Sequence, residues 1–183
     1  MATVVDSIYL DFQDAARVLG NTGEISLKLL IESHLRRTLL LSAASYFELR
    51  ITRDVEGFCS ELTEGNELIV SLIKTKVISR QYHSWFSWDS NNANTFFAMF
   101  GPSFKQYMSG VVSKDEDLKN AIKAFLELGN ERNKLVHSDY ASYLINKTPD
   151  EIHALYLLGL QFVERIGVEL RAYSKKMDQI EAV

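Results

Sequence analysis

The sequence predicts an all-α protein in which long antiparallel helices pack as a bundle, together with short accessory helices. Nearly every segment places apolar residues three or four positions apart, the spacing of a helix that buries one face. No convincing run of alternating apolar and polar residues, the pattern of a half-buried strand, occurs. Only 2 prolines interrupt the 183 residues, so long continuous helices are allowed.

The first third of the chain is expected to form three helices separated by glycine-containing turns. Residues 3–19 carry a mostly helical apolar spacing that ends at the sequence GNTG. A second pattern runs from Glu24 to about Leu62 without proline, and one unbroken helix of this length would span on the order of 50 Å. After a TEGN turn, residues 67–79 predict a shorter helix.

An irregular aromatic segment at residues 80–92, RQYHSWFSWDSNN, follows these helices. Its rings Trp85, Phe86 and Trp88 either pack beneath a long loop or stack on RNA bases, and packing is the more common use. Residues 93–108 then predict two short helices, broken at a Gly-Pro pair.

Two capping boxes indicate where the last two long helices begin. Ser113 is followed three positions later by Glu116, and Thr148 is followed by Glu151 with proline at the first helical position between them. The final helix carries one apolar face, made by Ile152, Leu155, Gly159, Phe162, Ile166, Leu170 and Tyr173.

Composition places the chain among globular proteins, with 46% hydrophobic and 24% charged residues. No internal repeat or linker divides it, so we expect residues 1–183 to form a single domain. The single cysteine, Cys59, rules out an intramolecular disulfide and a four-cysteine zinc site. The N-terminus lacks a basic start and its apolar residues are interrupted by acids, so we expect no signal peptide, no membrane span and a cytoplasmic protein.

Charge and motifs exclude several classes of function. The net charge of −4 argues against broad, non-specific nucleic-acid binding but leaves room for a local basic cleft. Phosphate-binding glycine loops are absent, and none of the four histidines has the spacing of a metal-ligand pair. We therefore expect no metal and no cofactor. His34, His83 and His153 are expected to be structural or surface residues.

The stretch ERNKLVHSDY, residues 131–140, contains the candidate catalytic pair, Arg132 and His137. Their spacing alone is also found on ordinary helix surfaces, but Asn133 lies four positions before His137 and so shares its face. A histidine moves protons near neutral pH, and a guanidinium holds a phosphate and stabilises charge that develops on it. Such a pair can cut RNA without a metal, with the ribose 2′-hydroxyl as nucleophile. One pair per chain is a thin site, which two chains meeting at a symmetric interface would double.

Glu48 belongs to a polar stripe on the long second helix and has two interpretations. It is either part of a solvated face, free or paired with Arg53 or the Arg36-Arg37 pair, or a carboxylate that orients Arg132 or His137.

The sequence RNKLVH resembles the Arg-Asn-x3-His signature of the HEPN superfamily. Residues 34–51 resemble the long helix that precedes this signature in HEPN proteins of the RiboL-PSP type, and residues 87–104 resemble their Asn-rich segment followed by Phe-Gly. The resemblance covers most of the chain from about residue 30 to residue 140.

This resemblance implies a helical bundle that forms a homodimer, with the Arg and His of both chains in one cleft. It implies a metal-independent endoribonuclease, often a toxin or effector in toxin–antitoxin or phage-defence systems, with an antitoxin or sensor protein as a further partner. By position the catalytic residues would be Arg132 and His137, with Asn133 and Glu48 in supporting roles. Toxins silenced by a nucleotidyltransferase carry a tyrosine two residues after the histidine, whereas here Tyr140 comes three residues after it.

The sequence therefore predicts an RNA substrate, and four further residues are candidates for contacting it: Arg36, Arg37, Lys134 and Tyr140. The alternatives are a non-catalytic HEPN-like module that binds RNA or a protein, and a purely structural helical subunit.

Overall fold

A computed structural model describes residues 2–140 and 142–181, and this part of the chain is helical without any strand, which confirms the all-α prediction. The α-helices are α1 (Val4–Asn21), α2 (Ile25–Leu62), α3 (Glu67–Ile73), α4 (Asn94–Ala98), α5 (Pro102–Lys114), α6 (Glu116–His137) and α7 (Pro149–Glu181). A π-helical turn at Lys74–Ile78 continues α3, and a 3-10 turn at Tyr82–Ser84 lies within the aromatic segment.

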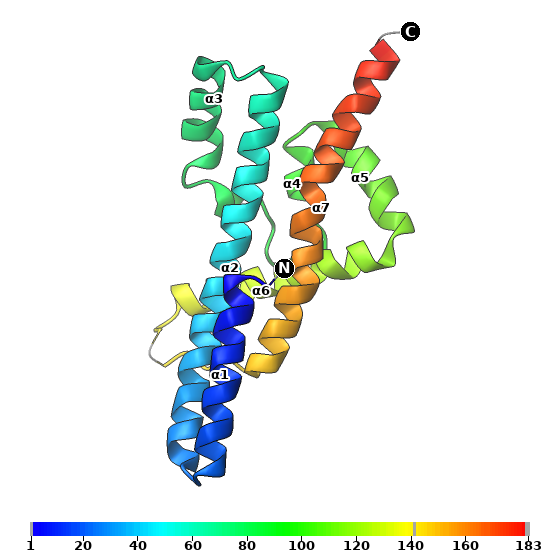
Figure 1. The fold of residues 1–183 in the computed structure, drawn as a ribbon. Helices are drawn as coiled ribbons and strands as arrows, with labels where there is room; N and C mark the ends of the chain where they lie inside the picture. The colour runs from blue at the N-terminus through cyan, green and yellow to red at the C-terminus, as the bar shows by residue number, and fades with distance from the viewer. Residues whose placement is uncertain (1, 141, 182–183) are drawn as a thin grey trace.

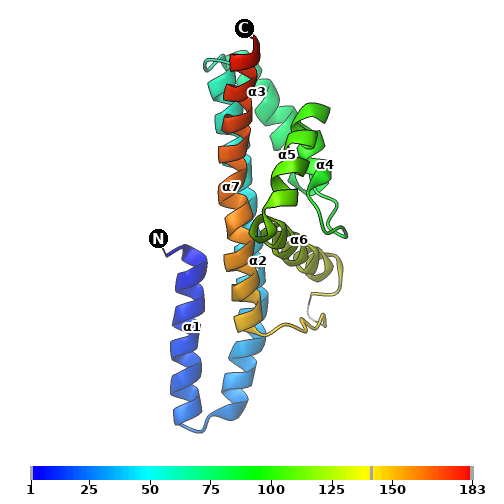
Figure 2. The same ribbon diagram turned by 90° about the vertical axis from the view of Figure 1, so that its right-hand side faces the viewer.

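The two longest helices, α2 and α7, lie side by side at the centre of the molecule (Figure 1). Helix α1 packs antiparallel to the first half of α2, while α3 to α6 lie on the other side of the central pair (Figure 2). Helices α2 and α7 run in the same direction, since Phe47 of α2 meets Gly159 of α7 and Glu61 further along α2 pairs with Arg171 at 2.6 Å. This orientation follows from the path of the chain, which α6 and the segment after it bring back before α7 begins.

The core of the bundle is aromatic where α2, α6 and α7 meet. The ring of Phe47 lies 5.5 Å from that of Phe125 and 5.4 Å from that of Tyr156, and all three side chains are buried. Burying a side chain of this size contributes roughly 1.5–3 kcal/mol to stability, so this cluster is a main source of the free energy that holds α6 in place.

Helix α1 is attached to α7 by a polar cluster near its start. Thr3 and Asp6 form a capping box, Tyr156 donates a hydrogen bond from its hydroxyl to Thr3 Oγ1 at 2.8 Å, and His153 Nε2 lies 2.8 Å from Asp6 Oδ1. The imidazole of His153 also stacks on the ring of Tyr9 at 3.9 Å. His153 therefore has the structural role expected from the sequence.

The two predicted capping boxes have different outcomes. At the start of α7, the N–H of Thr148 donates to the Glu151 carboxylate at 2.7 Å and the N–H of Glu151 donates to Thr148 Oγ1 at 3.2 Å, as predicted. The prediction of Ser113 as the cap of the next helix was wrong, because α5 continues through it to Lys114. Asp115 caps α6 instead, accepting a hydrogen bond from the N–H of Leu118 at 2.9 Å.

None of the helices in the described ranges is both long and apolar enough to cross a lipid bilayer.

Replacing Asp115 with alanine should lower the free energy of unfolding by about 1 kcal/mol, because the N–H of Leu118 loses its acceptor. Ser113→Ala removes only a side-chain hydrogen bond to the carbonyl of Gly110 within α5, and its effect should stay within about 0.5 kcal/mol. Urea unfolding followed by circular dichroism measures both. A larger loss in Ser113→Ala than in Asp115→Ala would contradict this assignment of the cap.

Candidate functional site

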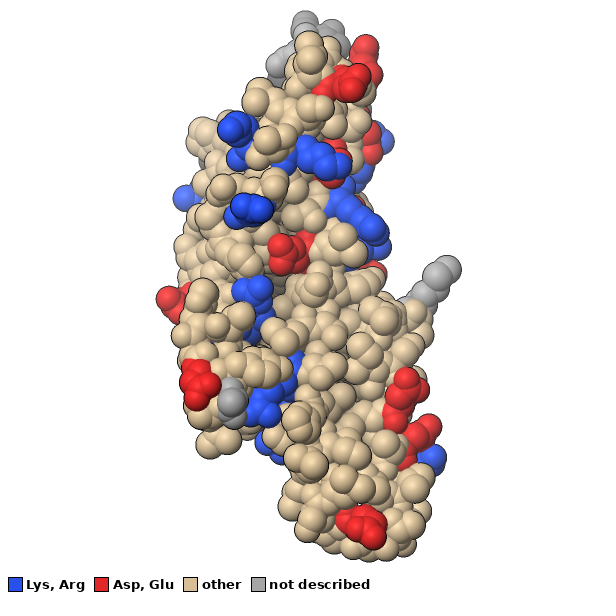
Figure 3. Space-filling view, turned by 90° about the vertical axis from the view of Figure 1, so that its left-hand side faces the viewer, with Lys and Arg blue, Asp and Glu red and all other residues tan. Residues whose placement is uncertain are grey.

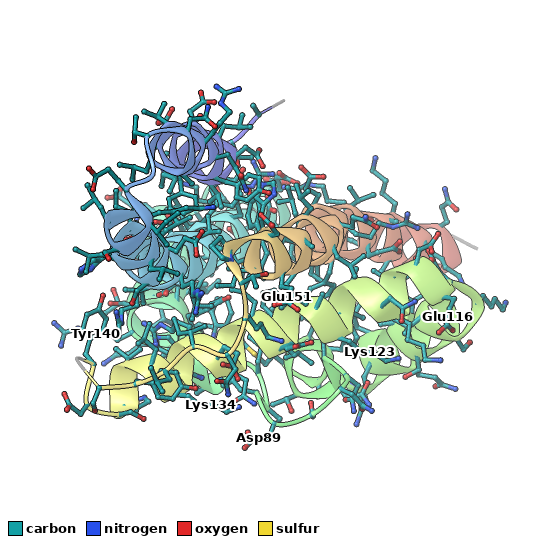
Figure 4. All side chains as sticks on the ribbon, turned by 90° about the horizontal axis from the view of Figure 1, so that it is seen from below. Asp89, Glu116, Lys123, Lys134, Tyr140 and Glu151 are labelled. Carbon is teal, nitrogen blue, oxygen red and sulfur yellow. The ribbon has the colours of Figure 1, made fainter. Side chains whose placement is uncertain are left out.

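The C-terminal half of α6 carries the Arg-Asn-x3-His residues, and the helix ends at His137 (Figure 4 shows α6 lengthwise, from Glu116 toward Lys134). Leu128 and Leu135 are fully buried on one face of this half and anchor it to the core. Arg132, four positions after Leu128 and three before Leu135, is half-buried on the same side of the helix, whereas half-buried Asn133 and exposed His137 lie on the other side. The helical period thus separates the anchoring leucines from Asn133 and His137, while Arg132 lies at the edge of the buried face.

Arg132 and Asn133 line a small, narrow pocket between α2, the aromatic segment and α6, with room for about one water molecule. The lining residues are Ala44, Phe47, Glu48, Tyr82, His83, Trp88, Phe125, Leu128, Gly129, Arg132 and Asn133. Arg132 Nη1 donates a hydrogen bond to Asn133 Oδ1 at 3.1 Å, so the amide holds the guanidinium at the pocket. The remaining donors of Arg132 are available to an anionic group that enters.

Glu48 brings a negative charge to the same pocket from α2. Within residues 2–140 and 142–181 its carboxylate forms no ion pair with an arginine, so the paired arrangement considered from the sequence is not the observed one. Burial raises the pKa of Tyr82 well above its usual value, Glu48 raises it further, and Arg132 acts in the opposite direction. The charges of Glu48 and Arg132 therefore both act on the Tyr82 hydroxyl at this pocket.

Trp88 fastens the aromatic segment to α6. Its ring lies directly on Gly129, where the Cβ of any other residue would overlap the ring atoms. Its indole N–H donates to the carbonyl oxygen of His83 at 2.8 Å. Trp85 and Phe86 are buried, and the Trp85 indole N–H donates to the carbonyl oxygen of Val77 at 3.2 Å. Packing rather than base stacking is thus the role in which the structure places Trp85 and Phe86.

His83 is the residue at this pocket that the sequence did not single out. It is exposed, as expected of a surface residue, but it lies at the pocket beside Arg132 and Glu48. Partial burial lowers the pKa of His83, the charges of Arg132 and His137 lower it further, and Glu48 opposes them. No local pattern around position 83 indicates this placement, since it depends on the distant contact between Trp88 and Gly129.

The four candidates for contacting RNA do not lie together. The guanidinium of Arg37 lies over the ring of Tyr140 at 5.7 Å, and its Nη2 donates to the carbonyl oxygen of Tyr143 at 3.2 Å. Lys134 pairs with Glu131 at 2.8 Å and lies toward Asp89 rather than toward Tyr140 (Figure 4). Arg36 instead lines a separate groove, together with residues of α1 and the start of α7. Only Arg37 and Tyr140 thus form a pair, next to the end of α6.

Basic side chains gather on the face formed by α2, α3 and the segment that follows α6. Figure 3 shows Lys and Arg side chains, with some Asp and Glu among them, along the upper and middle parts of this face, while its lower end is mainly acidic and apolar. A net negative charge is therefore compatible with a local basic surface.

No group of three His, Cys, Asp or Glu side chains in the described ranges is placed to hold a metal ion. Cys59 is half-buried, and burial raises the pKa of its thiol. The structure brings Arg132, Asn133, Glu48 and His83 together at the pocket, whereas His137, at the end of α6, does not line it.

Comparison with known proteins identifies the chain as a HEPN-type domain. The model of the RiboL-PSP-HEPN family matches residues 13–171, which is most of the chain, and the protein belongs to this family. Neither a curated protein nor a solved structure matches the chain significantly. The family assignment agrees with the resemblance found around the Arg-Asn-x3-His sequence.

Gly129→Ala should destabilise the protein by about 1–3 kcal/mol, because the added methyl group overlaps the Trp88 ring and forces the aromatic segment away from α6. Gly110→Ala is the matched control, since nothing lies within 4 Å of the added atom in the middle of α5. That substitution should be neutral or stabilising by up to about 1 kcal/mol. Urea unfolding followed by tryptophan fluorescence measures both, and equal stability of the two variants would refute the contact.

Proposed function

We propose that this RiboL-PSP-HEPN protein is a metal-independent endoribonuclease whose site is built on Arg132 and His137. The observation that carries the proposal is the pocket itself, which gathers Arg132, Asn133 and Glu48 from two helices that are far apart in sequence. A half-buried guanidinium with one donor bound to an amide and the others available is suited to a phosphodiester.

The chemistry follows from the properties of these groups. The 2′-hydroxyl of the ribose attacks the adjacent phosphorus, and His137 transfers a proton to or from one of the two reacting oxygens. Arg132 stabilises the negative charge that develops on the phosphoryl oxygens. Asn133 holds Arg132 in position, and Glu48 supports the orientation of the site. The products carry a 2′,3′-cyclic phosphate and a 5′-hydroxyl.

A homodimer and a cellular role are further parts of the proposal. Two chains that bring both Arg-x4-His pairs into one cleft supply more positive charge and more proton-transfer groups than one chain. An endoribonuclease of this kind acts as a toxin or as an effector of phage defence, and needs an antitoxin or sensor protein that restrains it. Arg37 and Tyr140 lie next to the end of α6, where they would meet the RNA beside the cleaved bond.

His137→Ala should lower the rate of RNA cleavage by about 10²–10⁴-fold because a proton-transfer group is lost, and Arg132→Ala should cause a loss of similar size. Cleavage of total RNA by the purified proteins, with and without EDTA, measures the effect, and the wild type should be equally active in both. End-group analysis of the fragments should detect the cyclic phosphate.

His34→Ala is the matched control, because His34 is exposed on α2 about 20 Å along the helix from Glu48. It should leave cleavage unchanged. RNA binding without any product in the wild type, with equal binding by His137→Ala, would instead establish a non-catalytic binding module. Strict dependence on a metal ion would refute the mechanism.

Light scattering during size-exclusion chromatography should give twice the chain mass of 20.9 kDa. The activity per chain should then fall on dilution below the concentration at which the dimer forms, because the shared cleft comes apart. Full activity from a species with the mass of one chain would contradict a cleft made by two chains.

A further inference from the structure

A ribonuclease that works by attack of the 2′-hydroxyl has to move two protons. One leaves the attacking 2′-oxygen, and the other reaches the departing 5′-oxygen. The Arg-x4-His pair provides one imidazole per chain for these two tasks, because a guanidinium stays protonated at any pH at which the protein is folded. A second titratable group at the pocket would complete the site within the same chain.

We propose that His83 is this second proton-transfer group, and the inference rests on the proposed ribonuclease function. His83 lines the same pocket as Arg132, Asn133 and Glu48, and its imidazole is exposed to an entering ligand. It comes from a segment 49 positions before Arg132 along the sequence.

The backbone of His83 is fixed relative to the helix that carries Arg132. Trp88 holds its carbonyl oxygen through a 2.8 Å hydrogen bond, and the Trp88 ring lies on Gly129, three positions before Arg132 on α6. On the other side, the neighbouring Tyr82 is 4% exposed and anchors the 3-10 turn. The imidazole of His83 is thus exposed to a ligand while its backbone is held in a fixed position, which is the arrangement that a catalytic side chain requires.

The charges that face His83 assign it the role of general base. Partial burial lowers the pKa of His83 most, and Arg132 and His137 on α6 lower it further, while Glu48 on α2 opposes them. The adjacent Tyr82 hydroxyl stays neutral because its own pKa is raised. An imidazole with a pKa below the usual value of about 6.5 is neutral at pH 7 and accepts a proton.

The reaction balances with this assignment. Neutral His83 takes the proton of the 2′-hydroxyl as the bond from the 2′-oxygen to phosphorus forms. Protonated His137 gives its proton to the 5′-oxygen as the bond from phosphorus to that oxygen breaks. Exchange of one proton with water then restores both imidazoles. Arg132 stabilises the phosphoryl oxygens throughout.

The test compares wild type, His83→Ala, His83→Gln, His137→Ala and the surface control His34→Ala on a single-stranded oligoribonucleotide that contains a step cleaved by the wild type. Both His83 variants should lose about 10²–10⁴-fold in kcat/KM. The acidic fall in wild-type kcat/KM should lie below the usual imidazole pKa of about 6.5, because the pKa of His83 is lowered, and it should disappear in both variants, in which this base is gone. Unchanged circular dichroism and urea midpoints in both would exclude loss of folding as the cause.

A substrate with sulfur in place of the 5′-oxygen at that step separates the two histidines, because a thiolate leaves without needing a proton. On it His137→Ala should recover to within about tenfold of wild type, while His83→Ala should stay at least about 100-fold slow.

Wild-type kcat/KM and an unchanged acidic limb in the His83 variants, with His137→Ala inactive, would overturn this inference and leave the proposed function standing. Recovery of His83→Ala on the sulfur substrate would overturn the assignment of His83 as the base. Absence of cleavage by the wild type would overturn both proposals.

Discussion

The close packing of α7 against α6 at Gly159 determines where the candidate site lies. A Cβ at this position would be 3.1 Å from the backbone nitrogen and Cα of Phe125, so any other residue would push the two helices apart by a few tenths of an ångström. Phe47 of α2 packs against the same point, and its ring contacts those of Phe125 and Tyr156. Because α6 is thus held against α2, the turn of α6 after Phe125 brings Gly129 and then Arg132 to the level of Glu48. The packing of the core therefore determines the position of the pocket.

The spacing of apolar residues and the positions of glycine, proline and capping residues were enough to predict most of the helices, because both signals depend on residues close together in sequence. The long α2, the break at Gly101-Pro102 and the capping box at Thr148 are examples. The start of α6 was misplaced by two residues because Ser113 and Asp115 both have side chains that can cap a helix. The choice between them depends on where α5 ends, which neighbouring residues do not reveal.

The residues of the candidate site also differ in whether the sequence alone could predict them. Arg132, Asn133 and His137 lie within one helical stretch, so the resemblance to the HEPN signature is enough to single them out in the sequence. Glu48 required a judgement about which face of α2 meets α6, and the structure brings it to the pocket. His83 was not found, because its position depends on a tryptophan five residues later that packs on a glycine of another helix. Contacts of this kind leave no pattern in a single sequence.

Because the aromatic segment is attached to α6 by apolar and neutral contacts, salt should affect the stability of the pocket differently from its affinity for a ligand. The Trp88 contact is apolar and its hydrogen bond joins neutral groups, so added salt does not weaken it. The charges at the pocket are different, since salt screens exposed ions beyond about 8 Å at physiological ionic strength and polyanion affinity falls steeply as salt rises. High ionic strength would therefore release a bound anionic ligand from the pocket and leave the pocket assembled, ready to bind again when the salt is removed.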